Sequence, residues 1–313
     1  MSSLSNPPLV SVIMNCYNSG EFLREAIDSV YSQTYANWEI IFFDNASTDN
    51  SAEIAKSYDS KLRYYREEKT ITLGAARNKA IALVRGEFVA FLDCDDIWLP
   101  CKLEKQIPLF HDNNVNLVYS DVINFNLAGV EKRLYERRKF YIGDCFRELL
   151  GDYCLSLVTV MVRHSALLSQ PFWFDERLQV SEEVDLFLRL AYCGQLAIIP
   201  EPLAKYRIHS QSLTIKRPDL FWKECEQILE QYEKLFPDFN MRFAIEIRKW
   251  RLMTLCSKAA YLWMAGNAVE ARRILWPYLN FLRPFIVYLL CFFPPLIGRM
   301  IKRERRIIPT MEI

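Results

Sequence analysis

Apolar residues over the first hundred positions alternate between short continuous runs and segments with a helical period. The continuous runs are typical of strands buried on both faces, and the periodic segments are typical of amphipathic helices. The predicted strands span residues 9–14, 39–43, 63–65 and 87–92, and the predicted helices span residues 22–30, 51–58 and 73–84. This alternation predicts an α/β fold with a mostly parallel central sheet, flanked by helices that make right-handed crossovers.

Helical periods replace this alternation in the last third of the chain. The predicted helices of that part span residues 221–235, 241–265 and 268–278. Pro237 ends the first of them, and Gly266 lies in the turn before the last. We therefore predict two domains, an α/β domain at residues 1–217 and a helical C-terminal extension at residues 218–313.

The C-terminal extension contains a segment, residues 283–306, that combines an apolar centre with basic flanks. Residues 285–298 are apolar almost throughout, but Pro294 interrupts them, and they are too short to span a bilayer core of about 30 Å. The basic flanks consist of Arg283, Arg299, Lys302, Arg303, Arg305 and Arg306. An apolar helix with basic flanks favours peripheral contact with a membrane, and burial against the α/β domain or a partner subunit is the alternative.

Composition narrows the class of protein further. The chain has 313 residues, 51% of them hydrophobic, and a net charge of +1, so no overall basic field predicts a nucleic-acid partner. Its nine scattered cysteines include no C-x-x-C pair, which favours reduced thiols in the cytoplasm. The first eight residues lack a basic region followed by an apolar one, so we expect no signal peptide there. Neither a G-x-G-x-x-G nor a G-x-x-x-x-G-K-[ST] motif follows the first strand, so the sequence predicts neither a dinucleotide-binding site nor a P-loop NTPase.

Three carboxylates follow the strand at residues 87–92, in the sequence Asp93-Cys94-Asp95-Asp96. Ligands of open α/β sheets gather at the carboxyl ends of such strands. Crowded carboxylates repel one another, and a divalent cation that also carries phosphate oxygens relieves this repulsion. The group therefore predicts an Mn²⁺ or Mg²⁺ site with a phosphate-bearing ligand, and a solvated acidic turn before the helix at Pro100 is the alternative.

Six short motifs in order resemble family-2 glycosyltransferases, which are metal-dependent inverting enzymes with the GT-A fold. The motifs lie at residues 10–18, 42–51, 74–80, 91–98, 181–191 and 206–210. Each motif alone is a weak signal, but their order and separations together are specific. The resemblance covers roughly residues 8–215 and implies a GT-A-like fold.

The resemblance implies a nucleotide site at the first two strand ends. Asp44 corresponds to the aspartate that relatives use to recognise a uracil-type base, whose single N3–H donor a carboxylate accepts. Tyr17 is expected to stack on the base, with Asn18 beside it, or else to pack the first turn. Arg77 is expected to contact the donor phosphates or the aspartates, with a helix-surface position as the alternative. Asp93 is expected to contact ribose or metal-bound water.

The resemblance also implies the metal ligands. The last acid of the Asp-x-Asp group binds the metal in relatives, which makes Asp95 the first choice, with Asp93 beside it and Asp96 as an alternate ligand. His209 is a further candidate for the metal or the diphosphate, because a neutral imidazole suits Mn²⁺. A surface position is the alternative for His209.

The catalytic base is where this chain departs from the pattern of the family. Inverting transfer needs a base that takes the proton of the attacking acceptor hydroxyl, and relatives use the aspartate of a Glu-Asp pair. The corresponding pair here is Glu182-Glu183, so Glu183 is the expected base with one more methylene. The alternative is a negatively charged first helical turn favoured by the helix dipole.

We therefore expect a glycosyltransferase that uses a nucleotide diphosphate-sugar, with a UDP-sugar as the first choice, and a glycan or lipid-linked hydroxyl acceptor. Its expected place is the cytoplasm, on the inner face of the membrane if the C-terminal segment makes contact. A sugar-phosphate nucleotidyltransferase would need a glycine-rich basic first turn, which residues 15–20 lack. A non-catalytic nucleotide-sugar-binding subunit is the third alternative, supported only by Glu183 in place of aspartate.

Overall fold

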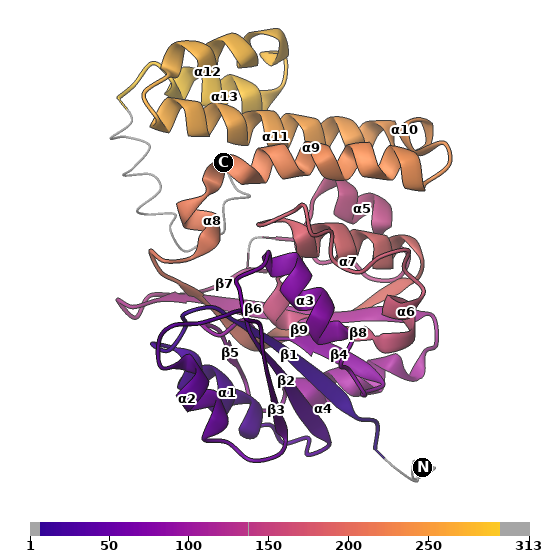
Figure 1. Ribbon diagram of the computed structural model, residues 1–313. Helices are drawn as coiled ribbons and strands as arrows, with labels where there is room; N and C mark the ends of the chain where they lie inside the picture. The colour runs from indigo at the N-terminus through magenta and orange to yellow at the C-terminus, as the bar shows by residue number, and fades with distance from the viewer. Residues whose placement is uncertain (1–6, 137, 295–313) are drawn as a thin grey trace. The chain divides into compact units, whose positions relative to one another are not determined.

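The computed structural model describes residues 7–136 and 138–294, and it divides into two compact units. The first unit contains the chain up to Phe125 together with Lys132–Phe146 and Cys154–Arg207. The second unit contains Asn126–Glu131, Arg147–Tyr153 and the chain from Ile208 onward. The first is an α/β unit and the second is almost wholly helical, as Figure 1 shows.

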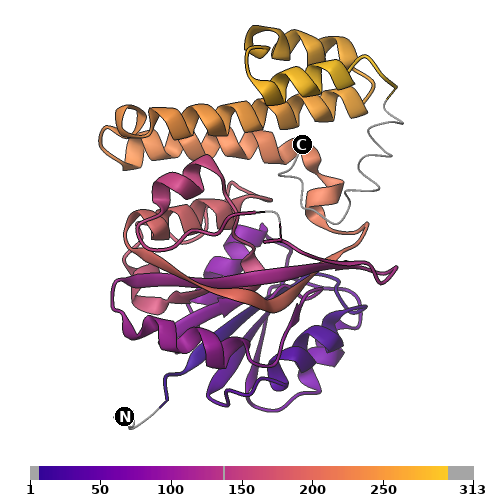
Figure 2. The same cartoon turned by 180° about the vertical axis from the view of Figure 1, so that it is seen from behind.

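A mixed sheet forms the centre of the first unit. Within the described residues it has nine strands in the order β3-β2-β1-β4-β8-β6-β9-β5, with β7 paired to β6. The strands are β1 (Val10–Cys16), β2 (Trp38–Asp44), β3 (Leu62–Arg66), β4 (Phe88–Phe91), β5 (Ile97–Trp98), β6 (Val115–Asn126), β7 (Glu131–Arg133), β8 (Met161–Arg163) and β9 (Gln195–Ile208). Seen from behind, the long strands β6 and β9 lie side by side (Figure 2).

The first four strands of the order are parallel, which confirms the expectation from the apolar runs. In the register of β1 and β2, Cys16 lies opposite Asp44, so both strands end at the same edge. β4 lies on the other side of β1, with Ile13 opposite Phe91. β8 then pairs antiparallel with β4, so the remaining half of the sheet departs from a purely parallel arrangement.

Helices cover both faces of this sheet (Figure 1). The helices of the first unit are α1 (Leu23–Tyr31), α2 (Ser51–Lys56), α3 (Leu73–Ile81), α4 (Lys102–Gln106), α6 (His164–Leu168) and α7 (Glu182–Tyr192). On one face, Val12 and Met14 of β1 pack with Ile27 of α1 in the main hydrophobic core. On the other face, Phe91 of β4 meets Phe187 of α7 at 6.0 Å between ring centroids. Buried apolar side chains on both faces explain why the strands read as continuous apolar runs.

The second unit consists of helices packed along one long helix, α11. Its helices are most of α5 (Phe146–Gly151), then α8 (Leu213–Lys216), α9 (Pro218–Leu235), α10 (Phe239–Arg242), α11 (Ala244–Met264), α12 (Ala268–Leu275), the 3₁₀ turn η3 (Trp276–Tyr278) and α13 (Leu282–Leu290). The predicted helix at residues 241–265 is therefore two helices, α10 and α11. No helix in the described part of the chain is long and apolar enough to cross a membrane.

α13 has one buried and one exposed side. Val287 and Cys291 are buried in a core with Trp263 of α11 and Leu275 of α12. The exposed apolar side chains of this helix and its immediate surroundings are Leu282, Phe285, Ile286, Leu289, Phe292 and Phe293. The basic residues predicted to flank it on the C-terminal side, from Arg299 onward, lie outside the described residues.

Candidate active site

The carboxyl ends of β1, β2 and β4 meet at one edge of the sheet and carry most of the residues singled out above. Asp44 is the last residue of β2, Tyr17 follows β1, and Asp93 lies two residues beyond β4. Ligands bind at this edge in open α/β sheets. The structure therefore brings Tyr17, Asn18, Asp44 and the acidic group to one place in the fold.

Asp44 is fully buried and its carboxylate is held by three donors. The Tyr64 hydroxyl and Nη1 of Arg66 both donate to Oδ2 at 2.6 Å, and the amide of Ser47 donates to Oδ1 at 2.8 Å. A carboxylate has about four lone-pair sites, so these bonds leave one site on Oδ1 for a ligand donor. The expected contact with the N3–H of a base depends on that remaining site and stays a prediction.

Asn18 joins the turn after β1 to the turn after β2. It adopts a left-handed backbone with φ 51°, which asparagine tolerates better than most residues. Its Oδ1 accepts the amide of Thr48 at 2.8 Å, and its own amide donates to the Ser47 hydroxyl at 3.0 Å. Tyr17 is 55% exposed beside it, so its ring is open to a stacking partner.

The three aspartates after β4 have different surroundings. Asp93 is part-exposed and accepts Nη2 of Arg77 at 3.0 Å. Burial raises the pKa of Asp93, and the charge of Asp95 raises it further, whereas Arg77 lowers it. Asp96 is buried, and its pKa is raised well above the usual value by burial and by the neighbouring aspartates. Repulsion among the aspartates is the feature that a bound cation would relieve.

Arg207, a residue of β9 for which the sequence suggested no role, holds this acidic loop. Its amide donates to Oδ1 of Asp96 at 2.8 Å, and its Nε donates to the carbonyl of Asp95 at 2.7 Å. Its guanidinium also pairs with Glu25 of α1 at 2.5 Å. Arg207 lies in the motif at residues 206–210, and that placement was the only sequence signal for its contribution.

Arg77 is buried and bridges two carboxylates, so the helix-surface alternative for this residue is wrong. Its Nη1 pairs with Glu182 and its Nη2 with Asp93. Gly74 lets α3 pack closely against the backbone at Asp175, because a Cβ on residue 74 would lie 3.1 Å from the carbonyl oxygen of Asp175. Arg77 therefore connects the acidic loop after β4 to the start of α7.

Removing Arg77 should destabilise the protein strongly. Arg77→Met leaves Glu182 buried without its cation, and breaking a buried pair from one side costs about 3–5 kcal/mol. Replacing both partners, as in Arg77→Met with Glu182→Leu, should recover most of that loss. Urea unfolding of the two variants measures the difference. Equal stability of the single and double variants would show that the pair is not coupled.

Glu182 and Glu183, the first two residues of α7, differ in a way that bears on catalysis. Glu182 is buried and held by Arg77, whereas Glu183 is only part-buried. The pKa of Glu183 is raised to about 8, chiefly by burial and then by the negative charge of Glu182, while Arg77 acts to lower it. A base is most effective when its pKa lies near the working pH, so Glu183 has the more suitable pKa of the two.

Two other carboxylates of the first unit, Asp185 and Asp121, are already engaged by neighbouring donors. Oδ2 of Asp185 pairs with Nη2 of Arg189 at 2.8 Å, one turn further along α7. Asp121 of β6 accepts the amides of Val122 and Tyr135 and pairs with Arg133 at 2.8 Å. Both aspartates are fully buried, which explains their structural role and leaves Glu183 as the better candidate.

The residues at the sheet edge suit a hard divalent cation that is shared with phosphate. Within the described residues, no three or more His, Cys, Asp or Glu side chains group so as to enclose an ion by themselves. Mg²⁺-type sites usually take one or two carboxylates and complete their shell with phosphate and water oxygens. Asp93 and Asp95 supply such carboxylates.

Asn15 provides a second observation at this edge. It lies one residue before the end of β1, and its carbonyl accepts a hydrogen bond from the thiol of Cys94, between Asp93 and Asp95, at 3.3 Å. Both polar atoms of its side chain are buried and lack a hydrogen-bond partner among the described residues. A buried amide in this state is suited to a ligand or a water, since buried polar groups are normally paired.

His209 follows β9 and belongs to the second unit. Its proposed contact with the metal or the diphosphate stays a prediction. The individual roles of Tyr17 and Asp44 at the nucleobase, of Asp95 at the metal and of Glu183 as the catalytic base also stay predictions.

Comparison with known proteins identifies the family. The family model described as glycosyl transferase family 2 matches residues 11–172. The UDP-Glc:alpha-D-GlcNAc-diphosphoundecaprenol beta-1,3-glucosyltransferase WfgD of Escherichia coli is 31% identical over 213 residues, which cover 66% of this chain and 79% of that protein.

Solved structures agree on the fold. The mannosyltransferase PcManGT of Pyrobaculum calidifontis, in complex with GDP-Man and Mn²⁺, superposes with a TM-score of 0.63 at 16% identity, over 95% of this chain and 87% of that one. Residues 1–349 of S. aureus TarS in complex with UDP-GlcNAc give a TM-score of 0.58 at 18% identity, over 94% and 92%. These likenesses confirm the GT-A-like α/β fold. The chain therefore belongs to glycosyltransferase family 2 and is a glycosyltransferase.

Proposed function

We propose that this glycosyltransferase moves a sugar from a UDP-sugar to a hydroxyl group of a lipid-linked or surface glycan, with inversion at the anomeric carbon. The observation that carries the proposal is Glu183, a part-buried carboxylate with a pKa raised to about 8. It follows Glu182, which Arg77 links to Asp93 of the acidic loop. The relative WfgD is named for a UDP-glucose donor and a diphosphoundecaprenol-linked acceptor, and TarS binds UDP-GlcNAc. Both names support the choice of donor and acceptor class.

The proposed chemistry is a single displacement. The acceptor oxygen attacks the anomeric carbon while Glu183 takes the hydroxyl proton, and the bond from that carbon to the diphosphate oxygen breaks. UDP leaves with the electron pair of that bond. Asp95 and Asp93 would hold an Mn²⁺ or Mg²⁺ ion, which when bound neutralises charge on the leaving diphosphate.

Asp44 and Tyr17 form the proposed site for the uracil ring of the donor. Uracil presents one N3–H donor, and the unused lone pair on Oδ1 of Asp44 accepts it. Arg66 and Tyr64 hold the Asp44 carboxylate in one orientation, so the uracil N3–H meets a preorganised hydrogen-bond acceptor. Tyr17, exposed at the end of β1, would cover the flat face of the ring.

A donor screen tests this function. The full chain is incubated with UDP-, dTDP- and GDP-sugars, with and without Mn²⁺, and release of the nucleoside diphosphate is measured. We expect release from a UDP-sugar only with the metal present. Binding of UDP-sugar without any release, even with a lipid-linked acceptor, would favour the non-catalytic subunit. In a parallel incubation with UTP and a sugar 1-phosphate, formation of a UDP-sugar with release of pyrophosphate would favour the nucleotidyltransferase.

The proposal includes peripheral contact with the cytoplasmic face of a membrane through α13. That helix keeps Val287 and Cys291 in the core of its unit while it exposes several large apolar side chains. Monomeric soluble proteins rarely expose contiguous apolar patches of this kind without a partner. An acceptor carried on a membrane lipid gives the contact a purpose.

Polar substitutions on the exposed side of α13 should weaken membrane binding without unfolding the unit. We expect the variant Phe285→Ser, Ile286→Asn and Leu289→Gln to leave vesicles that the unchanged chain binds in a sedimentation assay. Each of these side chains is 42–47% exposed, so little core packing is lost. Ile245→Asn, at an exposed apolar position of α11, is the matched control and should bind normally. Equal binding by all three proteins would rule out α13 as the contact.

A further inference from the structure

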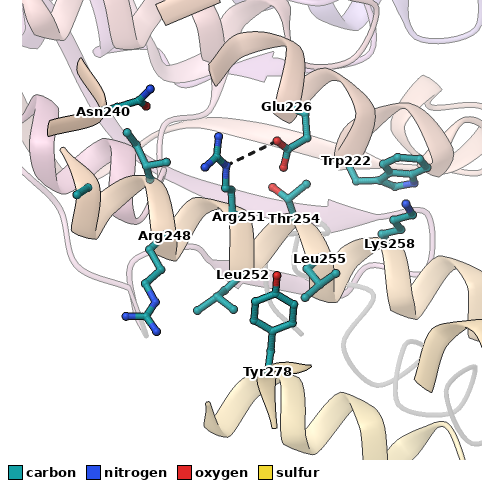
Figure 3. Close-up of a pocket in the computed structure, with 12 residues that line it drawn as sticks. Trp222, Glu226, Asn240, Arg248, Arg251, Leu252, Thr254, Leu255, Lys258 and Tyr278 are labelled. Atoms are coloured by element: carbon teal, nitrogen blue, oxygen red, sulfur yellow. Dashed lines mark ion pairs between the residues drawn. The ribbon is translucent and has the colours of Figure 1, made fainter. Parts of the chain in front are cut away.

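A pocket of about 560 Å³ lies in the helical unit, against α9, α11 and η3 (Figure 3). Pockets that bind small molecules usually measure about 300–1,000 Å³, so this one is large enough for a small ligand. Its charged and aromatic lining residues are Trp222, Glu226, Arg248, Arg251, Lys258 and Tyr278. The proposed catalytic chemistry uses none of them.

The lining of this pocket favours an anion. The lining contains three cations, Arg248, Arg251 and Lys258, and one carboxylate, Glu226. Glu233 beside Arg251 adds a second carboxylate, so the excess is one positive charge (3 − 2). Arg251 lies 3.9 Å from Glu226 and 3.5 Å from Glu233. Both distances exceed the roughly 2.7–2.9 Å of a charge-assisted N–H···O bond, so the guanidinium keeps donor capacity for a ligand.

Trp222 adds a donor to the same pocket. Its indole Nε1 is buried and has no hydrogen-bond partner in the described part of the chain. The ammonium group of Lys258 lies 4.6 Å from the centre of the Trp222 ring, and Figure 3 shows the two side chains next to each other. A buried indole N–H normally finds an acceptor. An anionic oxygen would serve both the N–H group and the ammonium group.

Apolar surface adjoins the pocket in the same unit. Tyr278 of η3 lines the pocket, while Trp276 of the same turn is 65% exposed. The guanidinium of Arg248 stacks 4.6 Å from the ring centre of Phe281, the residue before α13. A ligand with an anionic head and an apolar body would match this combination of a basic pocket and an exposed apolar helix.

We infer that this pocket binds the phosphate headgroup of an anionic lipid, while the exposed side of α13 contacts the acyl region. Arg251, Lys258 and the Trp222 N–H group supply the donors to the phosphate oxygens. The inference deepens the membrane contact proposed above and rests on it for the source of the lipid. It adds a specific headgroup site that the apolar contact alone does not require.

Vesicle binding by the full chain tests the site. Vesicles of phosphatidylcholine with phosphatidic acid should bind the unchanged chain, and vesicles of phosphatidylcholine alone should bind it less. Arg251→Gln and Lys258→Gln should each lower binding to the anionic vesicles about fivefold, as expected for one cation near an anionic surface. Glu226→Gln should raise binding, because it removes the carboxylate that competes with phosphate for Arg251.

Lys249→Gln is the matched control, because Lys249 is exposed on the same helix and does not line the pocket. A loss equal to that of Arg251→Gln would show diffuse charge attraction and overturn the inference. The unfolding midpoint of each variant is measured as well, and a midpoint equal to that of the unchanged chain shows that the variant is folded.

A soluble lipid separates this inference from the membrane contact of α13. Calorimetry with dihexanoyl phosphatidic acid should give the same ranking of variants, with tighter binding than inorganic phosphate. That ranking without vesicle binding would support the pocket and contradict the α13 contact. Equal affinity for inorganic phosphate would overturn the lipid as ligand. Binding of neither probe would overturn the pocket itself, with the donor screen in the α/β unit unaffected.

Discussion

Glu183→Gln should lower turnover by about 10²–10⁴-fold, with little change in donor affinity. The substitution keeps the size and hydrogen-bonding capacity of the side chain but removes its ability to take a proton. Donor affinity is retained because Glu183 is assigned to the acceptor side of the reaction. Steady-state kinetics and donor titration of the same preparation measure the two effects separately.

Glu182→Gln is the matched control for this change. Glu182 is paired with Arg77, so its loss should lower stability more than it lowers turnover per folded molecule. If Glu182→Gln has the larger effect on turnover, the register taken from the Glu-Asp motif is shifted by one residue. Full activity of both variants would move the base elsewhere in the site.

The raised pKa of Glu183 predicts a specific pH dependence. The ionised form is the active base, so kcat/KM should rise about tenfold per pH unit below pH 8 and level off above it. Stability should move in the opposite direction. The folded state holds a proton on Glu183 between pH 4.5 and about 8 that the unfolded state has lost, so the free energy of unfolding falls as the pH rises through that window. Glu183→Gln should remove both dependences.

Asp95→Ala should abolish metal-dependent donor binding and lower kcat/KM by about 10²–10³-fold. A bound divalent cation is worth several kcal/mol of stabilisation for the departing diphosphate, and Asp95 is its first-choice ligand. The side chain is not part of the hydrophobic core, so the fold should persist. Calorimetric titration of UDP with and without Mn²⁺ measures the loss.

Asp96→Asn serves as the comparison for the metal site. Asp96 is buried and accepts the Arg207 amide, a bond that asparagine can retain. This variant should therefore keep its dependence on Mn²⁺. Loss of metal dependence in Asp96→Asn and not in Asp95→Ala would make Asp96 the ligand.

The parallel half of the fold could be predicted because its strands are buried on both faces. β1 and β2 contain uninterrupted apolar runs, and the observed strands differ from the predicted ones by one or two residues at each end. The other half carries weaker signals. β9 contains Pro200 and Pro202, which argue against a strand, and much of it is only half-buried.

The candidate site could be predicted from the sequence where its side chains lie at or directly after the end of a strand. The positions of Asp44 and Asp93 depend only on the limits of β2 and β4, which the apolar runs define. The pairing of Arg77 with Glu182 joins residues 105 positions apart, and local pattern carries no signal for such a contact. The same applies to Arg207, which reaches the acidic loop across 111 positions.

The configuration of the product is the most direct test of the proposed single displacement. The full chain is supplied with Mn²⁺, an α-linked UDP-sugar that it accepts, and a lipid-linked N-acetylglucosaminyl diphosphate. Proton NMR of the purified product then reads the anomeric coupling constant. We predict a large coupling constant, which marks a β-linkage and therefore inversion, and no product from Glu183→Gln above the reduced rate given above. A small coupling constant, marking an α-linkage, would contradict single displacement and the role of Glu183 as the base.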